Sequence, residues 1–193
     1  MEKYTQLVKK ESEGKAISDE NDKVLYQDEY ITIRSLNGWS MLEEKDNVCC
    51  IPIFIEKNKI FLRKETVPSY NKRDSQEYHL TVISGTIETD ETPDMTLRRE
   101  LVEEAGIVLN DNYKINFLDC LFKSKSGTAK MFIALIPLSE SDYSETYIKG
   151  DGSKEEKNSQ TVSIDIKFIN SLFPADLVTR LLLLETKSYL NLK

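Results

Sequence analysis

The chain has 193 residues, of which 39% are hydrophobic and 31% charged, and its formal net charge is −7 at pH 7. This length suits one domain with a substantial core, and no apolar stretch of the sequence reaches membrane-spanning length. The negative charge argues against broad nucleic-acid binding, which favours basic faces, and the first residues lack the apolar run of a secretory signal, so we expect a cytoplasmic protein.

The first third of the chain predicts two hairpins. Residues 1–22 are polar and are expected to be partly disordered or a short helix. Apolar and polar residues then alternate on both sides of Asn37-Gly38, a dipeptide typical of hairpin turns. A second hairpin is predicted from strands over residues 48–55 and 59–64. Pro52 in the first of these strands predicts an edge position or a bulge, because proline cannot donate to the ladder.

The rest of the chain alternates between strands and helices. Residues 65–77 are expected to form a loop before a strand. A helix then starts at the capping residue Thr92 and stops at Gly106. The order of these elements predicts an α/β fold with a mixed sheet between helices. The remaining expectations, in chain order, are strands over residues 114–122 and 129–138, a long acidic loop over 139–160, a strand over 161–169 and an amphipathic helix over 174–190.

Three cysteines lie in stretches that look like strands. Cys49 and Cys50 are adjacent, and Cys120 stands alone. An odd count without C-x-x-C spacing argues against a disulfide framework or a zinc site. We therefore expect all three to pack in the core.

The run GTIETDETPDMTLRRELVEEAGI, residues 85–107, holds acidic residues at fixed spacing. Each helical residue turns by about 100°, so Glu100, Glu103 and Glu104 share one broad stripe of the predicted helix. Like charges at these spacings destabilise a helix by a few tenths of a kcal/mol per pair, so a compensating cation is needed. Mg²⁺ suits this role, because it takes carboxylate oxygens together with substrate phosphates. Another stripe, suited to packing on a sheet, consists of Leu97, Leu101 and, less cleanly, Ala105.

This run resembles the Nudix box, the signature of the Nudix hydrolase family, written G-x5-E-x7-R-E-U-x-E-E-x-G-U with U apolar. Every specified position is filled, beginning with Gly85 and Glu91. The resemblance implies the Nudix fold, an α/β/α sandwich with a mixed sheet, here preceded by an N-terminal β-hairpin. Residues 1–46 would form that N-terminal segment, which we expect to make a homodimer, and residues 47–193 the Nudix hydrolase domain.

What the resemblance implies for function is metal-dependent hydrolysis of a pyrophosphate bond in a nucleoside diphosphate linked to another moiety. Mg²⁺ or Mn²⁺ would be held by Glu100, Glu103 and Glu104, with the Gly85 carbonyl as an additional ligand. Glu103 or Glu104 would also orient or deprotonate water.

Arg99 has two interpretations. The resemblance implies a pair with Glu91 that holds the preceding loop against the helix. The plainer one is a helix salt bridge to Glu103, four residues on, and both can hold. In several family members the general base lies on a later loop. Glu155 and Glu156 are the candidates here, with Glu140 and Glu145 as further ones, although a solvated loop glutamate is the simpler interpretation of each.

The segments outside the box resemble the ADP-ribose pyrophosphatase branch of the family in their order. On that basis Arg63 would contact a phosphate or ribose, and Tyr70 or Trp39 would stack on a base, unless the two aromatic residues serve ordinary packing. The chain lacks the Glu-x-Pro-Ala-Gly approach to the box that this branch usually shows. Three hypotheses therefore remain: a hydrolase of ADP-ribose or a related nucleotide sugar; the same chemistry on dinucleoside polyphosphates, NTPs or capped RNA; and a non-catalytic nucleotide-binding module. The intact glutamates argue against the third.

Overall fold

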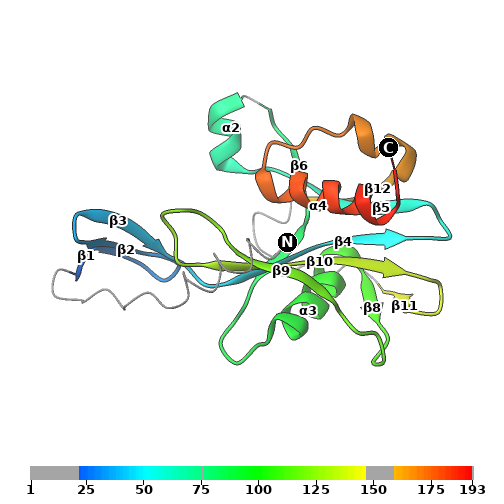
Figure 1. The fold of residues 1–193 in the computed structure, drawn as a ribbon, viewed down its shortest axis with the longest axis horizontal. Coiled ribbons are helices and arrows are strands. Elements are labelled where there is room, and N and C mark those ends of the chain that lie inside the picture. Colours follow the sequence, from blue (N-terminus) through cyan, green and yellow to red (C-terminus); the bar gives the residue numbers. More distant parts are fainter. Residues whose placement is uncertain (1–21, 75, 147–158, 193) are drawn as a thin grey trace, which may run out of the picture. The chain divides into compact units, whose positions relative to one another are not determined.

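The computed structural model describes residues 22–74, 76–146 and 159–192, which divide into two compact units (Figure 1). One unit holds, in its described part, residues 22–44 and 126–128. The other holds the described residues of 45–125 and 129–192. The prediction for the first 21 residues lies outside the described part of the chain.

The smaller unit is a three-stranded antiparallel sheet of β1 (Asp22–Gln27), β2 (Thr32–Leu36) and β3 (Trp39–Glu43). The hairpin predicted at Asn37-Gly38 is confirmed, and both residues have the positive φ of a type I′ turn, 51° and 83°. The alternating stretch before it is two strands rather than one. Asp28 separates them, because its carboxylate accepts the N–H groups of Tyr30 and Ile31 and closes a turn.

The larger unit is an α/β assembly. The strands of its main sheet are β4 (Asn47–Phe54), β5 (Lys59–Glu65), β6 (His79–Thr81), β7 (Ile83–Thr86), β9 (Phe117–Phe122), β10 (Lys130–Leu138) and β12 (Gln160–Asp165). The helices are α2 (Pro68–Asp74), α3 (Pro93–Ala105), α4 (Leu177–Tyr189) and the 3-10 helix η3 (Ile166–Ser171), and a small sheet pairs β8 (Ile107–Leu109) with β11 (Tyr143–Glu145). The main sheet is mixed: its order is β12-β5-β4-β10-β9, with β4 parallel to β10, β6 paired to β5 and β7 paired to β4.

The sheet separates two hydrophobic cores. Alternate residues of β4 face opposite sides, so Cys50 joins the core under α3, whereas Ile51 joins the core under α4. Figure 1 shows α3 and α4 on opposite faces of this sheet. Leu97 and Leu101 of α3 are fully buried, and each contributes roughly 2 kcal/mol through its burial. The predicted α/β/α sandwich with a mixed sheet is confirmed.

The prediction that Pro52 marks an edge or a bulge is wrong. β4 lies inside the sheet, with β10 along one side over its whole length. On its other side the ladder with β7 ends at Cys50, and the ladder with β5 begins at Ile53. Proline is tolerated here because β4 changes partners at this point, where a ladder N–H is dispensable.

Other differences from the expected elements are local. Residues 65–77 hold the short helix α2, started by Pro68, rather than only a loop. The last strand ends at Asp165, because Ile166 and Ile169 are buried at helical spacing in η3. Residues 143–145 of the expected acidic loop form β11, which pairs with β8.

Two of the three cysteines are where the sequence predicts them. Cys49 and Cys50 are fully buried, and burial raises the pKa of the Cys49 thiol to about 12. Cys120 is exposed on β9, at an end of the main sheet, so its predicted core role is wrong. All three are free thiols.

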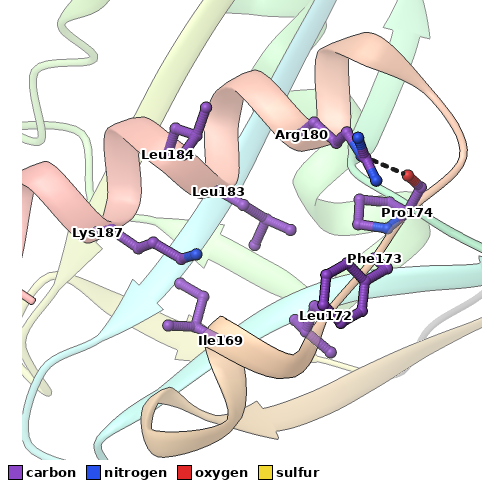
Figure 2. A pocket seen from close by; sticks show the side chains of 8 residues that line it. All are labelled: Ile169, Leu172, Phe173, Pro174, Arg180, Leu183, Leu184 and Lys187. Carbon is purple, nitrogen blue, oxygen red and sulfur yellow. Dashed lines mark hydrogen bonds between the residues drawn. The ribbon is translucent and has the colours of Figure 1, made fainter. Parts of the chain in front are cut away.

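An apolar hollow of about 220 Å³ lies between α4 and η3 with the segment that follows it (Figure 2). Its wall is fixed by Arg180, whose Nε donates to the Pro174 carbonyl at 3.0 Å. This hollow lies on the α4 side of the sheet, away from the glutamates of α3. In the described part of the chain, no helix is both long and apolar enough to cross a membrane.

Candidate active site

The helix that carries the glutamates begins and ends where the sequence predicts. Thr92 is its N-cap and accepts the Met95 N–H at 3.3 Å, with Pro93 in the first turn. Gly106 ends the helix in the left-handed conformation, with φ 66°. These caps fix the rotation and length of α3, and therefore the places from which the glutamates project.

Arg99 gathers three of the box glutamates around one guanidinium group. Its Nε lies 2.9 Å from Glu91 Oε1, and one terminal nitrogen lies 2.6 Å from Glu100 and 2.9 Å from Glu103. The other terminal nitrogen donates to Glu91 and to the Thr86 carbonyl at the end of β7. Both interpretations of Arg99 therefore hold in the structure: it ties the loop to the helix and it pairs along the helix.

Glu91 is the fixed point of the loop before α3. Hydrogen bonding from Arg99, with further donation by the Thr96 hydroxyl and the Glu88 N–H, holds the pKa of Glu91 at about 2. Thr96 is fully buried and donates to Glu91 at 2.9 Å. Sequence reasoning missed Thr96, although a polar residue beside the apolar stripe of a helix is a signal that could have found it.

Gly85 is a glycine because Glu100 occupies the space of its side chain. A Cβ atom placed on Gly85 would lie 1.8 Å from Glu100 Oε1. Glu100 itself is 8% exposed and packs between α3 and β7. The first position of the box and its first helical glutamate therefore form one steric unit.

Replacing Gly85 with alanine should displace the Glu100 carboxylate and lower turnover by about tenfold or more, since a side chain at an active site must be held within about half an ångström. Turnover and the melting temperature would be measured together. Gly38→Ala is the comparison, because its Cβ meets nothing within 4 Å although its φ is +83°. The Gly38→Ala variant should be less stable but should keep the turnover of the wild type. Equal turnover in both variants would show that the close contact between Gly85 and Glu100 has no role in activity.

Glu104 has a second arginine as its partner. Arg63 of β5 places its Nε 3.2 Å from Glu104 Oε1, an ion pair that is not aligned as a hydrogen bond. The Ser84 N–H donates to the other carboxylate oxygen at 3.1 Å. The sequence predicts that a metal ion compensates the negative charge of these glutamates. Arg99 and Arg63 supply part of that compensation.

The two arginines compensate the negative charge of Glu100 and Glu104 only in part. Burial raises the pKa of Glu100 to about 7 against the opposing effect of Arg99. Burial also raises the pKa of Glu104 to about 8 against Arg63 and the Ser84 N–H. Carboxylate oxygens are the donors that hard divalent cations take, so the donor set fits such a cation. Within the described residues, however, no three acidic, cysteine or histidine side chains are grouped as a metal site.

Comparison with known proteins agrees with this geometry. A model of the NUDIX domain matches residues 43–165, which is most of the chain. The chain belongs to the Nudix family. It is accordingly an enzyme, a pyrophosphohydrolase, as the complete Nudix box indicates.

A solved structure extends the likeness of fold beyond the matched domain. The chain resembles the crystal structure of an ADP compounds hydrolase with a TM-score of 0.65 and 19% sequence identity. The alignment covers 92% of this chain and 97% of the other. No curated protein sequence matches this Nudix chain.

Of the residues predicted outside the Nudix box, Arg63 pairs with Glu104, and the others that the structure describes lie in separate segments. Trp39 belongs to the smaller unit and is 72% exposed. Tyr70 lies on α2, and its ring makes a T-shaped contact with the ring of His79, 5.3 Å between centroids. Glu155 and Glu156 lie outside the described residues. Of the further base candidates, Glu140 is exposed, and Glu145 pairs with Lys57 at 3.0 Å.

Proposed function

We propose that this Nudix hydrolase splits the pyrophosphate bond of ADP-ribose or a related nucleotide sugar with the help of Mg²⁺ or Mn²⁺. The observation that carries the proposal is the complete Nudix box, in which Arg99 pairs with Glu91, Glu100 and Glu103, and Glu100 packs against Gly85. A binding-only module would not need all of these carboxylates.

Glu100, Glu103 and Glu104 would hold the divalent cation, together with the Gly85 carbonyl. When bound, such an ion neutralises the diphosphate and makes a water molecule more acidic. Arg99 donates to both Glu100 and Glu103 and so keeps their carboxylates close together. These side chains would therefore need to move little when a metal ion binds.

The chemical step needs a water molecule, an acceptor for its proton and a leaving phosphate. The water oxygen bonds to one phosphorus as the bridging P–O bond breaks, which leaves two phosphomonoesters. The proton of the water goes to a carboxylate, either Glu103 or Glu104 in our proposal, or a glutamate of the later loop. Catalysis is mainly positioning and charge stabilisation, because the diphosphate itself is anionic and repels the nucleophile.

The assignment to ADP-ribose or a nucleotide sugar is supported by two features. The similar solved protein is an ADP compounds hydrolase, and its likeness covers 92% of this chain rather than the Nudix domain alone. The small sheet β1–β3 also precedes the catalytic sheet, in the order of the branch that the sequence resembles.

The test is a substrate panel at saturating Mg²⁺ with release of monophosphate as the measured product. We expect ADP-ribose or a nucleoside diphosphate sugar to have the highest kcat/KM, and dinucleoside polyphosphates, NTPs and capped RNA to be at least about tenfold poorer. A higher kcat/KM for a dinucleoside polyphosphate, an NTP or capped RNA would show that the proposed substrate is wrong, although the protein would still be a Nudix hydrolase. An assay with excess EDTA is the control, and unchanged turnover there would refute the metal dependence.

The proposed homodimer stays a prediction. The smaller unit does expose large apolar side chains, including Tyr26, Tyr30 and Trp39. Exposed apolar groups of this size are typical of surfaces that bind another chain.

A further inference from the structure

We propose that Arg63 is a positioning residue for Glu104, rather than a residue that contacts the substrate. This inference rests on the proposed function, in which Glu104 holds a divalent cation. It replaces the substrate-binding role that the sequence suggested for Arg63.

Arg63 holds both the side chain and the main chain of Glu104. Its Nε pairs with the carboxylate at 3.2 Å, and one terminal nitrogen donates to the Glu104 carbonyl at 3.3 Å. That carbonyl lies in the last turn of α3, just before Gly106, where helical carbonyls lose their intrahelical donors. One guanidinium group therefore fixes the end of the helix and the carboxylate that projects from it.

The last strand of the sheet, β12, contacts both Arg63 and the Glu104 carbonyl. Thr161 of β12 is paired in register with Arg63 and donates its hydroxyl to the Glu104 carbonyl. The Thr161 hydroxyl also accepts from Arg63 at 3.3 Å, and Ser159 accepts from the other terminal nitrogen. Glu104 is thus fixed by residues of β5 and β12 that are far from the Nudix box in sequence.

Burial excludes the simplest alternative. Arg63 is 4% exposed; its two terminal nitrogens donate to groups of the protein, and its Nε lies 3.2 Å from the Glu104 carboxylate. A phosphate or ribose that bound this group would have to displace Glu104, Thr161 or Ser159 from it. An arginine that binds substrate would need donors free toward solvent.

The test measures Mn²⁺ binding without nucleotide, by electron paramagnetic resonance, in Arg63→Met, Arg63→Lys and Thr161→Val. Loss of a group that orients a metal ligand weakens metal binding by about 10- to 100-fold. We expect that loss in Arg63→Met. Arg63→Lys should recover part of it through its charge, and Thr161→Val should show a smaller loss. Arg180→Met is the matched control, since Arg180 also donates to a main-chain carbonyl but lies on α4.

Kinetics over a range of metal concentrations, with the nucleotide KM taken at saturating metal, separates the rival roles. A positioning role predicts a higher metal concentration for half-maximal activity in Arg63→Met and an unchanged KM for the nucleotide. A raised KM with unchanged Mn²⁺ affinity would overturn the proposal in favour of substrate contact. A lower melting temperature with both constants unchanged would overturn it in favour of a merely structural role. If Arg63→Met does not fold, Arg63→Lys and Thr161→Val decide by the same criteria.

The wild-type protein distinguishes failure of this inference from failure of the proposed function. Mn²⁺ binding without turnover of any nucleotide would sink the proposed function, and the Arg63 variants would still be judged by Mn²⁺ affinity. Turnover and Mn²⁺ binding that Arg63→Met leaves intact would sink the inference alone. Absence of Mn²⁺ binding in the wild type would sink both.

Discussion

Glu103→Gln should lower turnover by about a hundredfold or more while leaving the fold intact. Glutamine keeps the size of the side chain and its hydrogen bond from Arg99, but it removes the negative charge that a divalent cation needs. The side chain of Glu103 is 32% exposed, so loss of its ion pair with Arg99 costs little stability. The measurements are kcat at saturating Mg²⁺ and the melting temperature. Glu104→Gln should lower turnover by orders of magnitude as well.

The matched control for this variant is Glu185→Gln. Glu185 is an exposed glutamate on α4, which packs in the core on the other face of the sheet from α3. Its substitution should change neither turnover nor stability. Full activity in both Glu103→Gln and Glu104→Gln would show that the assignment of the metal ligands is wrong.

Arg99→Met should lower the free energy of unfolding by about 2 kcal/mol, because it leaves three carboxylates without their shared cation. This figure already allows for solvent screening of a side chain that is one-third exposed. For a protein of this size it corresponds to a drop of about 4–8 °C in melting temperature. Turnover of Arg99→Met should also fall, by a factor of about 10 to 100, since Glu100 and Glu103 lose the group that orients them.

Arg98→Met separates the two effects. Arg98 is the preceding residue of α3, has similar exposure and pairs with Asp94 at 2.8 Å, away from the box glutamates. We expect thermal unfolding of this variant to show some loss of stability, with kcat near that of the wild type. Equal losses of kcat in both arginine variants would mean that Arg99 acts only through helix stability.

The Nudix box could be located from sequence because its spacing is local. Thr92, Gly106 and the 3.6-residue period determine which way the glutamates of α3 project, and the structure follows them. The pairing of Arg99 with Glu91 and Glu103 is also within reach of sequence reasoning, since all three lie in one short segment.

Contacts between distant segments were outside that reach. Nothing in the sequence near Glu104 indicates that Arg63 and Thr161 converge on its carbonyl, because this depends on β12 lying beside β5. The same reason explains Pro52. Its neighbours β7 and β10 are remote in sequence, so the rule that proline favours an edge was the only guide available.

The position of β4 has a consequence for how the chain folds. β4 lies early in the sequence, but its parallel partner β10, which pairs Met131 with Asn47, is synthesised much later. In the same way β5 pairs with β12, near the end of the chain. Pairings over such separations close large loops, which slows folding. On a ribosome, the helix with its glutamates would emerge well before the strand that holds Glu104, so catalytic competence should be among the last properties that the growing chain acquires.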